Sequence, residues 1–433
     1  MPGAVRASSL VKGIPCAVQH CPQRELQKEL MSKRRILSWL PEGLLRLLSP
    51  EETSVLAKSE RRIDRRGLLE SDPGHEPVLR SSLNWLCKAQ EYSASKDGGV
   101  ARDYSLIHGW SSSYPETTGY IIPTFLLCAQ RTGDPVTLEQ RATRMLDWLV
   151  SIQMPSGAFQ GGKIDSTPVV PVTFNTGQIL LGLVAGQKSF GEYEQPLQRA
   201  ADWLVQTQDP DGCWRKFPTP FAISGEKTYE THVAWGLLEA ARLYPNRGYG
   251  EAALSNVQWA LRHQQDNGWM DKCCLSDMSR PLTHTLGYAL RGIIEAARYD
   301  NDRTLVSAAR KTADGLMSVL QDDGFLPGRL TADWEPAAKW ACLTGIVQIA
   351  HCWLLLYEMT GEERYFKAGQ VANEYVRRTV TLSGPEDVSG GVKGSFPVDG
   401  DYNPYRYLSW AAKFLIDSLI LELKISAQRD AAT

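Results

Sequence analysis

Residues 203–214 read WLVQTQDPDGCW, and the same arrangement recurs along the chain with a regular period. A Trp is followed five residues later by a Gln, and in most copies a turn containing Gly comes next. The copies begin at Trp85, Trp148, Trp203, Trp259 and Leu316, the last with Leu in the aromatic position. Successive copies lie 63, 55, 56 and 57 residues apart. This period fits two helices and two connections, so each repeat is predicted to form one helical hairpin.

The two helices of each repeat have different patterns. The segment before the Gln, as in LEQRATRMLDWLVSIQ (138–153), mixes charged and apolar residues at helical spacing, which predicts a half-exposed outer helix. The segment after the turn, as in FNTGQILLGLVAG (174–186), is nearly apolar all round, which predicts a buried helix. A small residue stands in the first turns of each such segment: Gly119, Gly177, Gly236, Gly287, Gly345 and Ala411.

Six buried helices that alternate with amphipathic helices predict an all-α fold, an (α/α)6 toroid of six helical hairpins. We expect residues 1–75 to form a partly helical N-terminal packing arm, 76–426 the toroid domain and 427–433 a tail. An open solenoid is the alternative, and it would need polar caps at its ends. The amphipathic stretch 35–48 is interpreted as part of the packing arm, with a membrane-surface helix as the alternative.

Composition limits the partners. The net charge is −2 among 433 residues, so no global positive field exists to attract nucleic acid. No apolar stretch reaches the length of a membrane span, and we expect no stable membrane insertion. The nine cysteines form no secreted disulfide framework, which favours reduced thiols and a cytoplasmic location. The oligomeric state stays open.

Two copies of the repeat carry a family resemblance. Gln153-x-x-x-Gly157-x-Phe159 and Gln208-x-x-x-Gly212-x-Trp214 resemble the QW repeats of the terpenoid cyclase and protein prenyltransferase superfamily. The architecture is similar to that of six-hairpin glycosidases, toroidal polysaccharide lyases and sugar epimerases. The string GWSSSYPETTGY (109–120) looks like squalene-cyclase-like proteins of bacterial surface-polysaccharide gene clusters. The resemblance spans about residues 80–424, and it implies the fold without fixing the reaction.

The chain departs from the superfamily's known chemistry. The DxDD acid motif of class II terpene cyclases is absent from the sequence. Asp271 and Cys273 with His284 come nearest to the zinc ligands of protein prenyltransferases, but the spacing does not match. We therefore expect no metal and no cofactor.

Candidate site residues follow from the geometry of a toroid. The turns that lead from outer to inner helices all lie at one end of the ring, so polar residues near the starts of inner helices should meet in one cleft. The candidate catalytic residues are His232, His284, Tyr229, Glu116 and Asp401. The candidate substrate-binding residues are Trp110, Tyr120, Asn175, Gln178, Trp235, Tyr288, Arg291, Trp334, Lys339, Lys393 and Tyr402.

These residue types favour a sugar over a terpenoid. Aromatic faces stack on sugar rings, and amides and charged groups bind hydroxyls and carboxylates. His232 and His284 begin consecutive inner helices 52 residues apart, and histidine titrates near neutral pH as acid and base catalysis requires. The alternative is that both histidines, like Glu116 at its helix start, only stabilise helix ends.

The sequence therefore predicts a carbohydrate-active enzyme with a saccharide substrate, a polysaccharide or oligosaccharide. Three reactions compete: elimination from a uronate by a lyase, epimerisation, and glycoside hydrolysis by two carboxylates, for which Glu116 and Asp401 are the best pair. Lyase or epimerase ranks ahead because His and Tyr outnumber the carboxylates. The alternatives are a terpenoid cyclase or prenyltransferase-like enzyme and a non-catalytic polysaccharide-binding scaffold.

Overall fold

The computed structural model describes residues 54–131 and 133–431. The chain divides into two units, Met1–Val55 and Leu56–Thr433, and the fold below is that of the second unit. The amphipathic stretch 35–48 lies outside the described residues.

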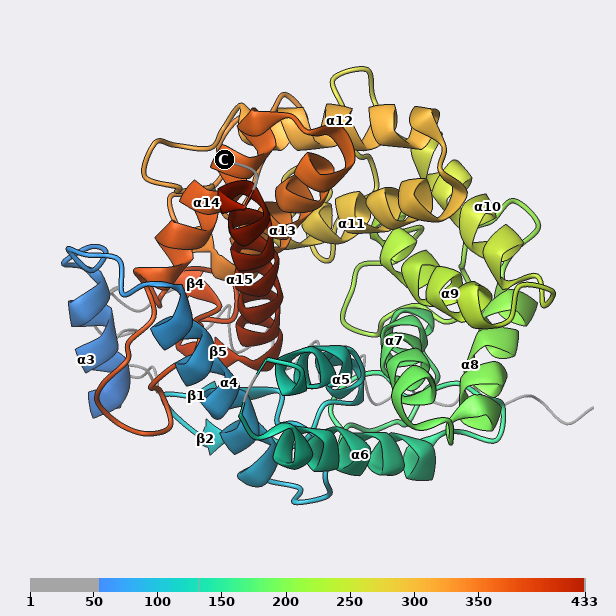
Figure 1. Ribbon diagram of the computed structural model, residues 1–433, viewed down its shortest axis with the longest axis horizontal. Coiled ribbons are helices and arrows are strands. Elements are labelled where there is room, and N and C mark those ends of the chain that lie inside the picture. Colours follow the sequence, from blue (N-terminus) through green and yellow to red (C-terminus); the bar gives the residue numbers. More distant parts are fainter. Residues whose placement is uncertain (1–53, 132, 432–433) are drawn as a thin grey trace, which may run out of the picture. The chain divides into compact units, whose positions relative to one another are not determined.

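Twelve helices of the second unit form two concentric layers (Figure 1). The outer helices are α4 (His75–Glu91), α6 (Pro135–Ile152), α8 (Glu194–Thr207), α10 (Tyr249–Leu261), α12 (Arg303–Met317) and α14 (Glu363–Arg377). The inner helices are α5 (Pro115–Ala129), α7 (Thr173–Phe190), α9 (Thr231–Leu243), α11 (Thr283–Asp300), α13 (Leu343–Thr360) and α15 (Ser409–Asp430). Each inner helix packs on the next, and α15 returns to pack on α4 and α5. This closed ring confirms the predicted toroid of six hairpins.

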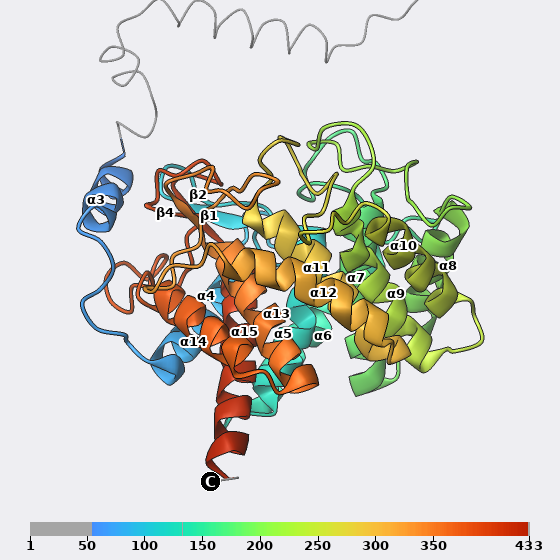
Figure 2. The same cartoon turned by 90° about the horizontal axis from the view of Figure 1, so that it is seen from above.

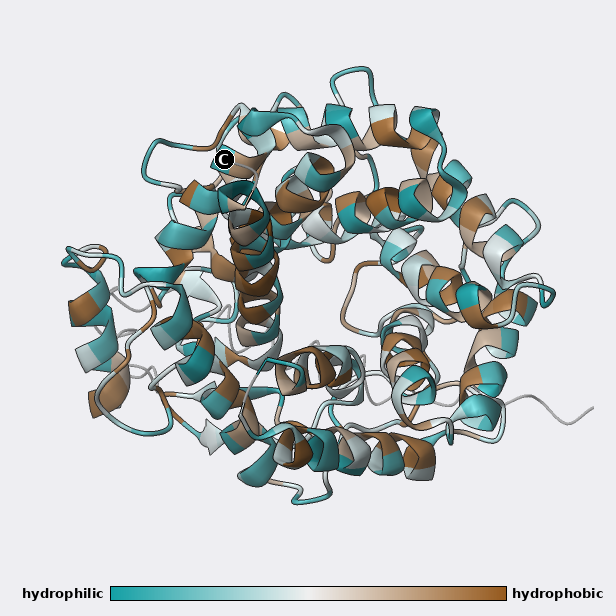
Figure 3. Cartoon of the chain, in the orientation of Figure 1, coloured by the Kyte–Doolittle hydropathy of each residue, from teal (hydrophilic) through white to brown (hydrophobic). Residues whose placement is uncertain are grey.

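Burial explains the two layers. The inner helices α5 and α7 bury most of their residues, on all sides, whereas α6 and α8 bury mainly one stripe. Figure 3 shows the same contrast, with α15 hydrophobic over most of its length. The inner helices also approach closely, because a Cβ on Gly236 would lie 2.5 Å from the carbonyl oxygen of Gly177. Glycine is the residue that leaves room for this contact.

The repeated Gln connects neighbouring hairpins. The Nε2 of Gln208 donates hydrogen bonds to the carbonyl of Gly212 in its own turn (3.0 Å) and to that of Ala252 in α10 (2.9 Å). Gln153 does the same with Gly157 and with Pro196 of α8, both at 2.9 Å. These two copies therefore tie their turns to the next outer helix, and Gln90 does so through Gly98 and Arg141.

The connections differ at the two ends of the ring. Outer helices lead into inner helices through long loops, all at one end, and inner helices lead back through short turns at the other end (Figure 2). Among the long loops lie a sheet of β2 (Gly109–Trp110), β1 (Asp103–Ser105) and β5 (Arg406–Leu408), and the pair β3 (Ala341–Cys342) and β4 (Ser395–Phe396). Because β1 pairs with β5, the loops of the first and last hairpins join in one sheet.

Two further contacts bring together distant parts of the chain. His75, at the start of α4, lies with its Nε2 2.8 Å from Oε1 of Glu422 in α15. The helix α3 (Val55–Asp64) is held by the buried Lys393, whose Nζ bonds the carboxylates of Glu60 and Asp64. No helix in residues 54–131 or 133–431 is long and apolar enough to cross a membrane.

Candidate active site

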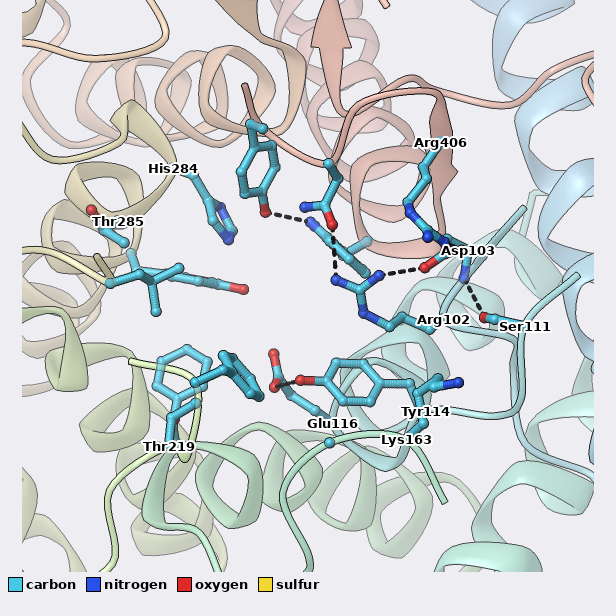
Figure 4. Close-up of a pocket in the computed structure, with 18 of the residues that line it drawn as sticks. Arg102, Asp103, Ser111, Tyr114, Glu116, Lys163, Thr219, His284, Thr285 and Arg406 are labelled. Atoms are coloured by element: carbon cyan, nitrogen blue, oxygen red, sulfur yellow. Dashed lines mark hydrogen bonds and ion pairs between the residues drawn. The ribbon is translucent and has the colours of Figure 1, made fainter. Parts of the chain in front are cut away.

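A cavity of about 580 Å³ opens among the long loops, and we call it the loop-end pocket (Figure 4). Its lining residues with titratable or charged side chains, apart from tyrosines, are Arg102, Asp103, Glu116, Lys163, His284 and Arg406. Its aromatic lining residues are Tyr114, Tyr120, Phe174, Phe221, Tyr229, Tyr288, Tyr402 and Trp410. The pocket thus combines aromatic surfaces with a few charged groups, as ligand sites commonly do.

Glu116 supplies a carboxyl group whose pKa lies close to neutral pH. It is the second residue of α5, directly after Pro115, and its Oε2 accepts a hydrogen bond from the hydroxyl of Tyr114 at 2.9 Å. Burial raises the pKa of Glu116 to about 7, although the Tyr114 hydrogen bond and the charge of Arg102 both lower it. A carboxyl group with this pKa can give or take a proton at physiological pH.

His284 supplies a neutral imidazole. It is the second residue of α11, and its Nδ1 lies 2.7 Å from Oε1 of Gln348 in α13. Because an amide oxygen only accepts, Nδ1 carries the proton and Nε2 keeps its lone pair. Burial lowers the pKa of His284 to about 4, and the Gln348 hydrogen bond only partly offsets this. At neutral pH the group is therefore a neutral base.

The two groups face each other. Figure 4 shows Glu116 and His284 on opposite walls, with the open part of the pocket between them. They come from α5 and α11, which stand on opposite sides of the ring (Figure 1). A ligand between them would have a proton donor on one face and a proton acceptor on the other.

A cationic group forms a third wall. Arg102 and Arg406 both bond the buried carboxylate of Asp103, Arg406 through Nη1 at 2.6 Å. Arg102 also donates to Oδ1 of Asn403 (2.9 Å), and its guanidinium lies 5.0 Å from the Trp410 ring centroid. Since one carboxylate balances two guanidinium groups, this wall keeps positive charge and suits an anionic or hydroxyl-rich ligand.

Aromatic rings form the remaining surface. Phe174 packs edge-on against Tyr229 (5.4 Å between centroids) and Tyr288 (5.1 Å). Burial raises the pKa of Tyr229, Tyr288 and Tyr120 well above 10, so their hydroxyls stay protonated and can donate. Phe221 lines the pocket yet is 59% exposed, which places an aromatic ring at its mouth.

Six candidates from the sequence line this pocket: Glu116, Tyr120, Tyr229, His284, Tyr288 and Tyr402. They share a place near the start of an inner helix or in the connection just before it. The positional argument of the toroid therefore predicted that these six side chains lie around one pocket.

The second histidine takes a different position. His232 also begins an inner helix, α9, and its Nδ1 lies 2.6 Å from Oε1 of Gln178 in α7, which mirrors the His284–Gln348 pair. It does not line the pocket, because it packs among the rings of Phe174, Tyr288 and Trp235. Burial lowers its pKa well below 6.5. The expectation that both imidazoles reach one cleft is corrected here: His284 lines the pocket and His232, with Gln178, lies in the core.

Two further candidates point away from the pocket along the ring axis. Trp235 and Arg291 line a separate cavity toward the short turns, with the guanidinium of Arg291 4.0 Å from the Trp235 ring centroid. Both lie beyond the first turn of their helices, so they face the other half of the ring interior.

The other candidates serve packing or lie at the surface. Lys393 is bound to α3, and Trp334 donates from Nε1 to the carbonyl of Asn267 (3.0 Å) in the connection between α10 and α11. Asp401 is 70% exposed and pairs with Arg329 at 3.2 Å, so it does not form the second carboxylate of the pocket. Three candidates remain. Trp110, in β2, donates a hydrogen bond from its Nε1 to the carboxylate of Asp387. Asn175 is buried beside Tyr114, and Lys339 is exposed on a loop.

Sequence reasoning missed Arg102, Asp103, Phe174, Asn403 and Trp410. Arg102 and Asp103 stand next to each other in an otherwise mostly apolar stretch, GGVARDYSLIHGW (98–110), and such a charge pair was a usable signal. The partner of the pair, Arg406, comes about 300 residues later, and no local pattern predicts that contact. Glu230, next to Tyr229, is buried with its pKa raised to about 8, but it does not line the pocket.

Metal ligands do not gather in the described part of the chain. Residues 54–131 and 133–431 contain no group of three or more His, Cys, Asp or Glu side chains arranged to hold a metal ion. Cys273, named above with Asp271 and His284, is buried and lies with its Sγ 3.2 Å from the carbonyl oxygen of Thr285.

Solved structures share this architecture. An unsaturated glucuronyl hydrolase specific for heparin is 14% identical, with a TM-score of 0.66, over 82% of this chain and 99% of its own. Cellobiose 2-epimerase from Bacillus thermoamylovorans (12% identical, TM-score 0.60, 84% and 98%) and a D-mannose isomerase (11%, TM-score 0.65, 82% and 98%) are also similar. These likenesses show that the chain has the fold of the α/α-toroid enzymes.

Comparison of sequences finds similarity over a smaller part of the chain. No family model matches the chain. A rice syn-copalyl diphosphate synthase (Oryza sativa subsp. japonica) is 24% identical over 209 residues, which is 46% of this chain. The chain spans about a quarter of the length of the curated relatives it matches (24%).

Proposed function

We propose that the protein is a carbohydrate-active enzyme that moves protons at a saccharide bound in the loop-end pocket, with Glu116 and His284 as the proton-transfer pair. The observation that carries this proposal is the pair itself: a carboxyl group with a pKa of about 7 opposite a neutral imidazole. Titratable groups whose surroundings separate their pKa values are typical of acid and base assignments in enzymes. The aromatic walls and the sugar substrates named for the structurally similar hydrolase, epimerase and isomerase support a saccharide.

Among the three reactions, epimerisation or elimination fits the pocket better than hydrolysis. Hydrolysis of a glycoside uses two carboxylates that flank the bond. The second carboxyl group that lines this pocket is Asp103, and its oxygens are bound by Arg102 and Arg406. Epimerisation or elimination needs a proton acceptor and a donor on the two faces of the sugar, and a cation beside the group that stabilises negative charge. His284, Glu116 and Arg102 would fill these roles.

A terpenoid cyclase-like reaction is the second candidate, because the matched rice enzyme is a diphosphate synthase of that class. Carbocation chemistry favours a lining without nucleophiles. The loop-end pocket instead holds a neutral imidazole, a carboxyl group and two guanidinium groups, which favours the saccharide.

The test is product analysis in deuterated water. The protein is incubated with a panel of neutral and uronate-containing oligosaccharides, and NMR detects three outcomes. Deuterium at a sugar carbon indicates epimerisation, a new double bond indicates elimination, and a new reducing end without carbon exchange indicates hydrolysis.

Variants decide the roles of the pair. Glu116→Gln and His284→Ala should each lower the turnover by about 10² or more, whereas Glu386→Gln, 85% exposed on the surface, should leave it unchanged. Turnover that needs Glu116 protonated should fall as the pH rises above about 7. Full activity of both pocket variants on the true substrate would refute the assignment, and turnover of a prenyl diphosphate in place of any sugar would refute the substrate class.

A further inference from the structure

A second cavity, of about 420 Å³, lies at the other end of the ring interior, and we call it the turn-end cavity. All six inner helices line it with residues beyond their first turns, such as Leu181 and Lys188 of α7 and Lys413 and Lys424 of α15. It shares Tyr120 with the loop-end pocket, and no other lining residue. It is therefore a separate chamber, with the Tyr120 ring between the two.

The deepest layer of this cavity is cationic. Lys413 has a 3% exposed side chain and bonds Oδ2 of Asp417 at 2.6 Å. Arg291, with a 13% exposed side chain, donates through Nε to Glu295 at 2.8 Å, and its terminal nitrogens make no hydrogen bond within the described chain. Burial lowers the pKa of Lys413. The carboxylate of Asp417 raises this pKa in part, and the positive charge of Arg291 lowers it further. Two buried cations thus lie close enough to repel each other.

His351 faces the same layer. Its Nδ1 is buried and has no hydrogen-bond partner among the described residues. Burial together with the charges of Arg291 and Lys413 lowers the pKa of His351 well below 6.5. A polar atom without a partner in a cavity usually marks a place where a bound group or water completes the hydrogen bonding.

The next turns toward the mouth are apolar. They present Leu127, Val184, Leu355, Ile420 and Leu421. In an α-helix seven residues rise by about 10 Å, so this apolar zone separates the cationic layer from the mouth by roughly that distance. At the mouth, two ion pairs at 2.8 Å, Lys188–Glu239 and Lys424–Glu358, each join neighbouring inner helices.

The charges of the cavity do not cancel. Its lining cations are Lys188, Arg291, Arg298, Lys413 and Lys424. Its three lining acids, Glu239, Glu358 and Asp417, leave an excess of two positive charges, and adding the bonded neighbours Glu295 and Arg242 leaves the same excess. Both buried cations have a carboxylate partner, Asp417 for Lys413 and Glu295 for Arg291. The other lining cations, Lys188, Arg298 and Lys424, have half-exposed side chains near the mouth. The excess of cations over acids therefore favours an anion as the ligand of this cavity.

From this arrangement we propose that the turn-end cavity binds an aliphatic monocarboxylate. Its carboxylate would lie between Arg291 and Lys413 within reach of His351, and its hydrocarbon body would lie against the apolar turns. The terminal nitrogens of Arg291, unbonded within the described chain, suit the two oxygens of a carboxylate, and the apolar zone favours a hydrocarbon over a sugar. The site is independent of the reaction proposed for the loop-end pocket.

The test measures binding of octanoate to the full-length protein by calorimetry, with acetate, which lacks the apolar body, and octanol, which lacks the charge, as comparators. Octanoate should bind at one site, and both comparators should bind at least ten-fold more weakly. Arg291→Met and Lys413→Met should weaken octanoate binding at least ten-fold. Lys367→Met, which removes one exposed surface charge from α14, should not.

Two further measurements guard against misfolded variants. Val184→Trp fills the apolar zone and leaves both cations in place, so it should abolish octanoate binding while circular dichroism stays that of the parent protein. A crystal soaked with 8-bromooctanoate should show the bromine among the turn-end residues. The proposal is overturned if octanol binds as well as octanoate, if well-folded Lys413→Met binds octanoate normally, or if the bromine lies in the loop-end pocket.

Discussion

Glu116 combines two opposed influences on one carboxyl group. Its place in the first turn of α5 favours the ionised form by about 0.3–1 kcal/mol through the helix dipole. Its burial favours the protonated form, and the rise of its pKa from 4.5 to about 7 corresponds to about 3 kcal/mol. The effect of burial is therefore the larger one, and ionising Glu116 lowers the stability of the folded protein.

This cost predicts how stability depends on pH. Between pH 4.5 and about 7 the folded protein keeps a proton on Glu116 that the unfolded chain has lost, so its contribution to the free energy of unfolding falls as pH rises. Glu116→Gln removes this dependence. Relative to the parent protein, the variant should gain about 2–3 kcal/mol of stability between pH 4.5 and pH 8, measured by urea denaturation at both pH values.

The exposed Glu386 gives the matched control, since Glu386→Gln should show the same difference from the parent at both pH values. A pH-independent difference for Glu116→Gln as well would mean that Glu116 ionises normally in the folded protein.

Residues near the starts of inner helices supplied most of the candidates that line the pocket. On the last long connection Tyr402 lines it, whereas Lys393 and Asp401 do not. Glu116 and His284 follow from their helix positions, because the toroid brings all those positions to one end. Lys393 and Asp401 lie on the connection between α14 and α15, where position along the chain does not fix the direction of a side chain. Lys393 instead meets carboxylates of α3 more than 300 residues earlier.

At the scale of the element, the repeated Gln is informative because Gln90, Gln153 and Gln208 each bond both their own turn and the next outer helix. Gln208 closes its own turn and reaches the next outer helix, so the same residue type is needed once per hairpin. Outer helices could therefore be predicted from the period alone. The short strands could not, because pairs such as β1 and β5 join residues about 300 positions apart.

Removing one such Gln should cost about 1–2 kcal/mol of unfolding free energy, since Gln208→Leu takes away two hydrogen bonds from carbonyl groups. The carbonyl of Gly212 keeps a bond from Asn256 at 2.9 Å, which limits the loss. Gln206→Leu, two residues earlier and exposed, should change stability by less than about 0.5 kcal/mol. Equal losses in the two variants by urea denaturation would contradict the role assigned to Gln208.

At the scale of the whole molecule, the sequence predicted the number of hairpins and which helix of each is buried. Ring closure was weighed against an open solenoid, and no pattern in the chain decided between them. Closure depends on contacts between the first and last hairpins, in particular β1 with β5 and α4 with α15. The sequences of these four elements resemble ordinary loops and helices, so nothing in them predicts that they meet.

The contact between His75 and Glu422 has a consequence for the order of the chain. It places the start of the first outer helix beside the last inner helix, where every other hairpin has a short turn. Any hairpin of the ring could then stand first in the chain, and the protein should tolerate circular permutation. A variant that joins Thr433 to Met1 through a Gly/Ser linker and begins at Glu192, an exposed short-turn residue, should keep the helical circular dichroism and cooperative melting of the parent. A permutant that melts without cooperativity would contradict this expectation.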